Sequence, residues 1–180
     1  MPPLPRLLRD RPARPWAGLV LAILALWTPS AGALSRDNRS LLRLMDEVCI
    51  VHHLTADAAV GRVRALHHDA RDLGTRGGPS HERAVAIGAS PPTLVTVAAP
   101  SPAARITECR ISGRTDDLME LEAAACAKWP LGRLRGMPAG IRGFAVTITA
   151  GSRNLSLRLT TRAEAGSRAG TFVFEAEQVH

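Results

Sequence analysis

Hydrophobic residues recur every three or four positions in three stretches of the chain, which is the spacing of one face of an α-helix. The expected helices cover residues 40–53, 56–72 and 115–129. Residues that favour helix N-caps stand at the start of each stretch: Ser40 or Asn38, Thr55, and Thr115. Gly74 is the expected C-cap of the second helix and Pro130 ends the third, so these helices have defined ends.

Apolar and polar residues alternate in the last third of the chain, as in strands that bury one face. This alternation predicts a β-meander with strands over residues 143–150, 154–162 and 170–179. Another strand is expected over residues 104–111. Residues 74–104 are rich in Gly and Pro, and they predict either a loop or edge strands, at 83–87 and 93–97.

One face of the predicted meander is apolar and the other is polar, which is typical of a sheet covered by helices on one side. We therefore expect an α+β fold with two layers, in which three helices pack on one face of a mainly antiparallel sheet of four or five strands with a C-terminal β-meander. On the polar face, Arg158 and Arg162 can pair across strands with Glu175 and Glu177, or the face can serve as a docking surface.

The first 33 residues have the organisation of a secretory signal peptide. An arginine-rich start is followed by an apolar run at residues 16–27, then by Pro29 and the small residues 31–33. The apolar run is shorter than the roughly 20 residues that cross a bilayer. We expect residues 1–33 to be cleaved, leaving a single α+β domain at 34–180. The alternative is a membrane-tethered domain that keeps its N-terminal segment.

Charge and composition restrict the class of partner. Four of the 23 basic residues and one of the 16 acidic residues lie in the leader, so the net charge is +7 with it and +4 without it. Four aromatic residues follow residue 33, too few for a surface that stacks nucleic-acid bases. Arginine outnumbers lysine 22 to 1, which is typical of a GC-rich bacterial genome. The expected location is therefore periplasmic or secreted.

The chain contains three cysteines, Cys49, Cys109 and Cys126. In an oxidising compartment two of them are expected to form a disulfide. A central strand can face either neighbouring helix, so the expected bond joins Cys109 to Cys49 or to Cys126. The remaining thiol is then free.

Two histidine pairs, His52-His53 and His67-His68, suggest a metal site that includes Cys49. Each pair is expected near the C-terminal end of a helix. If the two helices form an antiparallel hairpin, the pairs lie roughly 20 Å apart, too far to share one ion. Cys49 and His52 remain candidates for a two-ligand metal site or a catalytic thiol pair, because they are three residues apart on one helix face.

The segment at residues 130–143, which joins the third predicted helix to the meander, mixes Gly with Arg133, Arg135 and Arg142. Arginine side chains and exposed backbone N–H groups can hold an anion. The segment lacks the spacing of a phosphate-binding P-loop, so nucleotide binding is not indicated. Its candidate contacts are acidic polysaccharide or anionic lipid headgroups.

No serine-hydrolase elbow or comparable catalytic motif is present. The sequence therefore favours a small exported protein that is not an enzyme: a binding or envelope-associated module whose partner is an unknown protein or an anionic envelope component. No catalytic residue, cofactor or nucleic-acid partner is expected, and a membrane is an expected partner only if the leader is retained. The alternative is a small metal- or thiol-dependent enzyme that uses Cys49 and His52.

Overall fold

The computed structural model describes residues 35–50, 54–76 and 80–179. Within these residues, eight strands form one antiparallel sheet in the order β1-β2-β3-β4-β8-β7-β6-β5. The strands are β1 (Arg71–Arg76), β2 (His81–Ile87), β3 (Thr93–Ala99), β4 (Glu108–Thr115), β5 (Gly132–Arg133), β6 (Ile141–Ala150), β7 (Arg153–Ala163) and β8 (Gly170–Val179). The C-terminal meander is present as expected, but the prediction of four or five strands is wrong.

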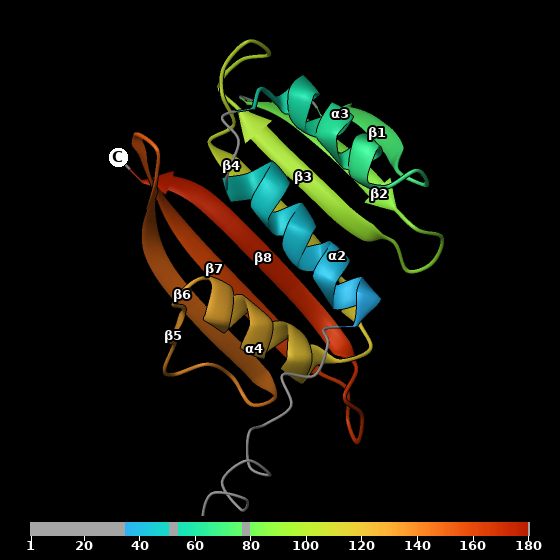
Figure 1. Ribbon diagram of the computed structural model, residues 1–180, viewed down its shortest axis with the longest axis vertical. Helices are drawn as coiled ribbons and strands as arrows, with labels where there is room; N and C mark the ends of the chain where they lie inside the picture. The colour runs from blue at the N-terminus through green and yellow to red at the C-terminus, as the bar shows by residue number, and fades with distance from the viewer. Residues whose placement is uncertain (1–34, 51–53, 77–79, 180) are drawn as a thin grey trace, which may run out of the picture. The chain divides into compact units, whose positions relative to one another are not determined.

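Helices α2 (Arg36–Leu44), α3 (Ala56–Leu66) and α4 (Leu118–Lys128) cover one face of this sheet, and they lie in front of the strands in Figure 1. A short π-helix, η2 (Met45–Ile50), continues α2. The α+β class, the three helices and the antiparallel sheet are therefore confirmed.

The helix N-caps match the sequence prediction at one of three positions. Thr55 caps α3 as expected, because its hydroxyl accepts a hydrogen bond from the Ala58 N–H. The caps of α2 and α4 are instead Ser35 and Asp117. Thr115 ends β4 rather than starting a helix, and its hydroxyl donates to a fully buried amide side chain, that of Asn38, at 2.6 Å.

Residues 67–76 account for one strand that the sequence pattern missed. The predicted helix over 56–72 ends early, because His67 adopts extended backbone angles (φ −134°, ψ 105°). The Asp72 carboxylate accepts a hydrogen bond from the Gly74 N–H at 2.8 Å, a local contact that favours a turn over a helix. Gly74 has φ +85° at a bulge inside β1, so it is not a helix C-cap.

Strands β2 and β3 are internal, so the prediction of a loop or edge strands at 74–104 is also corrected. β1 takes the edge position, and β2 pairs with β3 over its whole length and with β1 over residues 82–86. Pro91 and Pro92 lie in the turn between β2 and β3, where their missing N–H groups interrupt no strand pairing.

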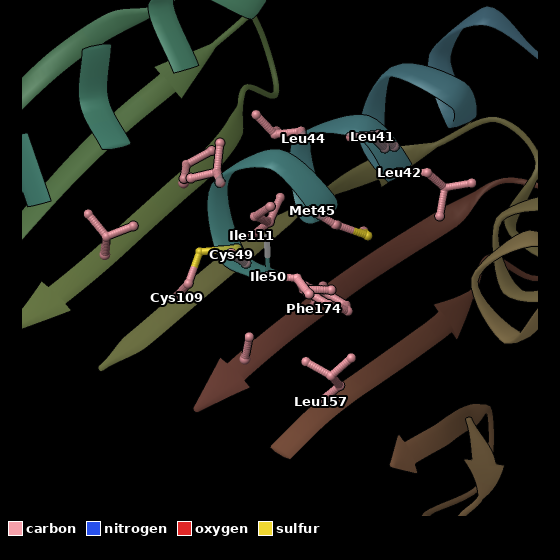
Figure 2. Close-up of a cluster of buried hydrophobic side chains, with 14 of the residues drawn as sticks. Leu41, Leu42, Leu44, Met45, Cys49, Ile50, Cys109, Ile111, Leu157 and Phe174 are labelled. Atoms are coloured by element: carbon pink, nitrogen blue, oxygen red, sulfur yellow. A yellow bond between two sulfur atoms is a disulfide. The ribbon is translucent and has the colours of Figure 1, made fainter. Parts of the chain in front are cut away.

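The core lies between the helices and the covered face of the sheet. Large side chains in this core are fully buried, and Figure 2 draws five of them near η2: Leu44, Met45, Ile111, Leu157 and Phe174. Each such side chain contributes about 1.5–3 kcal/mol by leaving water. A disulfide joins Cys49 of η2 to Cys109 of β4, with a Cα–Cα distance of 5.4 Å, which selects one of the two expected pairings.

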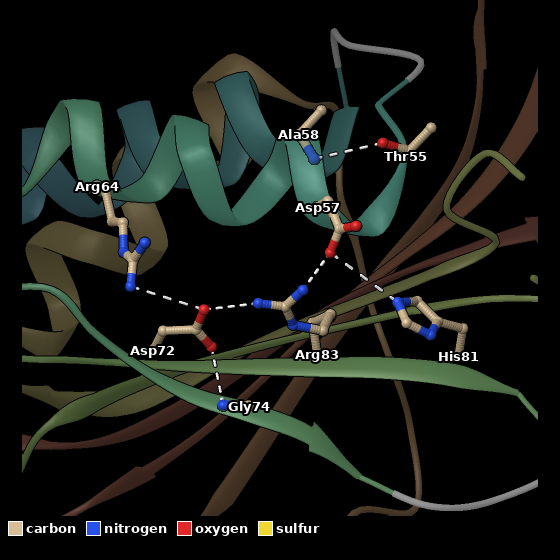
Figure 3. A network of polar contacts seen from close by, with 8 residues as sticks. All are labelled: Thr55, Asp57, Ala58, Arg64, Asp72, Gly74, His81 and Arg83. Carbon is tan, nitrogen blue, oxygen red and sulfur yellow. Dashed lines mark hydrogen bonds and ion pairs between the residues drawn. The ribbon is translucent and has the colours of Figure 1, made fainter. Parts of the chain in front are cut away.

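A polar network fixes α3 to the sheet (Figure 3). The Arg83 guanidinium donates to Asp57 on α3 and, at 2.6 Å, to Asp72 on β1. Arg64 of α3 lies 3.6 Å from the same Asp72 carboxylate. Because these contacts join a helix and two strands, Arg83 holds three elements that are separate in sequence.

Candidate functional site: the arginine segment beside helix α4

The arginine segment, residues 130–143, crosses from the end of α4 to the edge of the sheet. Within it, β5 pairs with β6 so that Arg133 lies opposite Phe144. The Leu134 N–H then donates to the Gly143 carbonyl at 2.8 Å. The segment is therefore held to β6 by backbone hydrogen bonds at the sheet edge.

Gly143 lets the arginine segment lie close against β6. A Cβ atom at this position would meet Leu134 Cδ1 and Met137 Sδ at 3.1 Å, closer than nearly all such contacts. The absent side chain leaves room for Leu134 and Met137 to pack on the strand. These two apolar contacts fix the position of the arginines on either side of them.

Arg133 and Arg135 are exposed, and no described residue forms an ion pair or hydrogen bond with either guanidinium. Together with Arg142 they line a cavity of about 590 Å³. A concave surface that holds unpaired guanidinium groups is suited to an anion, because each guanidinium offers planar, charged N–H donors to phosphate or carboxylate oxygens.

Arg142, the third candidate, has a partner. Its Nε forms an ion pair with Glu122 Oε1 at 3.0 Å, and the same buried carboxylate accepts a hydrogen bond from the Thr161 hydroxyl. A buried carboxylate needs such compensation, because a charge without partners in the core costs several kcal/mol. Arg142 therefore contributes to the packing of α4 on the sheet as well as to the cavity wall.

A second cavity of about 540 Å³ adjoins the first and shares Arg133 and Arg142 with it. Met119 on the first turn of α4 and Arg168 from the β7–β8 turn line its other side. Met119 is 57% exposed, and Arg168 pairs with Asp117 at 2.9 Å. The surface thus combines an exposed apolar side chain with arginines from three parts of the chain.

Sequence reasoning missed Met119 and Arg168. For Met119 a signal was present, because Leu118, Leu121 and Ala125 form the inward stripe of α4 and are fully buried, so helical phase places residue 119 outside. For Arg168 no signal existed, because its position depends on how the β7–β8 turn meets the start of α4.

The histidine and cysteine candidates are not brought together in the described part of the chain. His52 and His53 lie outside the described residues. The disulfide takes the Cys49 thiol out of the Cys49/His52 pair, since a thiolate is the form that binds metals and acts as nucleophile. Among the described residues, no group of three or more His, Cys, Asp or Glu side chains is placed to hold a metal ion.

His67 lies in a cleft of about 400 Å³, with its Nε2 atom 3.5 Å from the Ser40 Oγ atom. Burial lowers the pKa of the His67 imidazole, with an opposing effect from Asp69. No carboxylate among the described residues hydrogen-bonds to this imidazole, so the pair lacks the third group that orients the base in a catalytic serine site.

The polar face of the sheet carries charges of both signs. Arg158 lies opposite Glu175, but Glu175 forms its ion pair with Arg110, at 3.4 Å. Arg162 lies opposite Thr171, so its expected pairing with a glutamate is wrong. Because acidic and basic side chains alternate over this face, its charge does not select one class of ligand as the arginine segment does.

Comparisons of the chain with protein-family models, with curated proteins and with solved structures give no match. In the described part of the chain, no helix is long and apolar enough to cross a membrane. What the arginine segment binds is therefore inferred from its geometry and charge.

Proposed function

We propose that this protein is an exported, non-enzymatic module that binds an anionic component of the cell envelope through the arginine segment. One observation carries the proposal: Arg133 and Arg135 are exposed and have no carboxylate partner among the described residues, whereas their neighbours Arg142 and Arg168 are neutralised by Glu122 and Asp117. Unpaired cations on a concave surface raise the local concentration of anions.

Export is supported by two features. The Cys49–Cys109 disulfide is compatible with an oxidising compartment, where such bonds persist. The arginine-rich start, the apolar run at 16–27 and the small residues at 31–33 are the expected parts of a signal peptide. An exported arginine surface meets envelope polyanions rather than nucleic acid.

The test is binding of inorganic polyphosphate, a soluble polyanion, to the protein recovered from the periplasm of a bacterial host. The double variant Arg133→Ser/Arg135→Ser should bind at least tenfold more weakly, with a shallower dependence on salt, because two phosphate contacts are lost. The matched control is Arg158→Ser/Arg162→Ser. It removes the same charge from two other exposed arginines, on the polar sheet face. Equal affinity of the two double variants overturns the proposal.

A further inference from the structure

We infer that the anionic component is the surface of a lipid bilayer, and that Met119 enters its headgroup region while the arginine segment contacts lipid phosphates. This inference rests on the proposed function and names its ligand. A soluble polyanion offers nothing to an exposed apolar side chain, whereas a bilayer interface accepts apolar groups beside phosphate. Met119 and Arg133 line one cavity, so both contacts fall on one surface.

The rest of this surface is compatible with a bilayer. Pro138, Ala139 and Gly140 are exposed at the rim of the same cavity, and none of them is charged. On α4, Glu122 is turned inward to Thr161, so the outer side of the helix carries no acidic side chain between Glu120 and Lys128. Between Glu120 and Lys128 the outer side of α4 is therefore apolar, with Ala123 and Ala127 exposed.

The start of the described chain lies at the same corner of the domain. The Ser35 N–H donates to Glu120 Oε1 at 2.8 Å, and the Asn38 side chain donates to the Asp117 carbonyl at 2.9 Å. Ser35 is therefore fixed beside the first turn of α4, the turn that carries Met119.

These positions define an orientation. Met119, Arg133 and Arg168 line one cavity, so they would face the membrane surface together. Helix α4 covers one face of the sheet (Figure 1), so the polar face is on the other side of the sheet and points away from the bilayer. The exposed apolar side chain and the unpaired arginines thus mark one face toward the lipid.

The test compares vesicles of phosphatidylglycerol with vesicles of phosphatidylcholine in flotation assays, using the periplasmic protein with its N-terminus determined by mass spectrometry. Wild type should float with phosphatidylglycerol and not with phosphatidylcholine. Met119→Ser should weaken flotation roughly threefold to tenfold and leave polyphosphate binding unchanged. Leu73→Ser is the matched control, since Leu73 is 55% exposed on the edge strand β1, and it should bind like wild type.

A second measurement locates the contact directly. Trp129 contributes the same background signal to every variant, so tryptophan fluorescence of Met119→Trp should be quenched by brominated phosphatidylglycerol more than that of wild type, and that of Leu73→Trp should not. Polyphosphate binding that depends on Arg133 and Arg135, without flotation or quenching at residue 119, overturns the bilayer inference and leaves the proposed function standing. If wild type binds neither polyphosphate nor phosphatidylglycerol vesicles, both the bilayer inference and the proposed function are overturned. A dimer that dissociates on Met119→Ser, seen by sedimentation, shows that a second copy covers this surface and also overturns the inference.

Discussion

Cys49 and Cys109 are 60 residues apart in sequence and joined by a disulfide that ties the π-helix η2 to the central strand β4. The bond lies among the largest buried side chains, so it crosses the layer between helices and sheet (Figure 2). Closing a loop of this length restricts the unfolded chain by about 4 kcal/mol.

We therefore expect the double variant Cys49→Ala/Cys109→Ala to unfold with a free energy about 4 kcal/mol below that of wild type, measured by urea denaturation without reductant. Reductant should lower the free energy of unfolding of wild type to that of the double variant, and it should leave the value for the double variant unchanged. Cys126→Ala should behave like wild type under both conditions, because Cys126 is free. A variant as stable as wild type would show that the bond does not restrict the unfolded chain.

Asp72 gives the domain a defined sensitivity to acid. The Gly74 N–H and the Arg83 guanidinium hold the pKa of this carboxyl below its usual value. A carboxyl whose pKa is lowered on folding stabilises the folded state above its ordinary pKa, and this contribution is lost as pH falls below about 4. At pH 7, Asp72→Asn should lower the free energy of unfolding by about 1–3 kcal/mol.

The measurement is urea denaturation of wild type and Asp72→Asn from pH 7 to pH 2.5. The difference in the free energy of unfolding between the two proteins should become smaller as the pH falls, because protonation makes the Asp72 side chain of wild type neutral, like that of the variant. Asp116→Asn, at an exposed carboxyl, is the control and should show no such difference. A constant difference between wild type and Asp72→Asn over this range would contradict the explanation.

Residues whose surroundings are set by local periodicity were predictable. The inward stripe of α4, Leu118, Leu121, Ala125 and Trp129, is buried as expected, because one helix face determines it. The alternation in β6, β7 and β8 likewise predicts their pairing, since neighbouring strands of a meander share one apolar face. Thr55 as a cap follows from its hydroxyl and the helix that starts after it.

Residues whose conformation depends on distant partners were not predictable. Leu66 and Ala70 continue the helical spacing of α3, yet the chain leaves the helix at His67 and pairs Asp72 with Val85 of β2. The strand forms because Arg83 and the neighbouring β2 backbone offer partners that local propensity cannot register. The pairing of β1 with β2 and the absence of a helix C-cap at Gly74 have this one cause.

The candidate site shows the same division. Arg133 and Arg135 follow from charge and glycine content alone. The partner of Arg142 does not follow from the sequence. Glu122 lies 20 positions earlier, and it turns inward only because α4 packs on Thr161. The choice between Cys49 and Cys126 as the partner of Cys109 also required the structure, because both lie on helices over the same sheet.

His67 should make stability fall in mild acid. Burial lowers the pKa of its imidazole in the folded state, while the unfolded chain takes up a proton near the ordinary value of 6.5. The unfolded state therefore binds more protons as the pH falls from 7.5 to 5.5, and the folded state loses stability. His67→Gln keeps a polar group near Ser40 and removes the titration, so its unfolding free energy should change less over this range.

Chemical denaturation at pH 7.5 and 5.5 measures this difference. His68→Gln serves as the control, because His68 is the exposed neighbour and its removal should leave the pH dependence of wild type in place. If His67→Gln and wild type lose equal stability between the two pH values, the pH dependence arises elsewhere in the chain.

Gly170, at the start of β8, is required by close packing. A Cβ atom there would lie 2.4 Å from the Arg162 carbonyl oxygen and 2.8 Å from Leu118 Cδ2, so the backbone of β7 or the first turn of α4 would have to move. We expect Gly170→Ala to lower the free energy of unfolding by about 1–3 kcal/mol, the usual cost of overpacking.

Gly61, inside α3, has no atom within 4 Å of its Cβ position. Gly61→Ala should raise the free energy of unfolding by about 0.5–1 kcal/mol, because alanine favours the helix. Urea denaturation of both variants measures these changes in the free energy of unfolding. If both substitutions changed it in the same direction, the loss of a glycine, and not the close contact at residue 170, would explain the effect of Gly170→Ala.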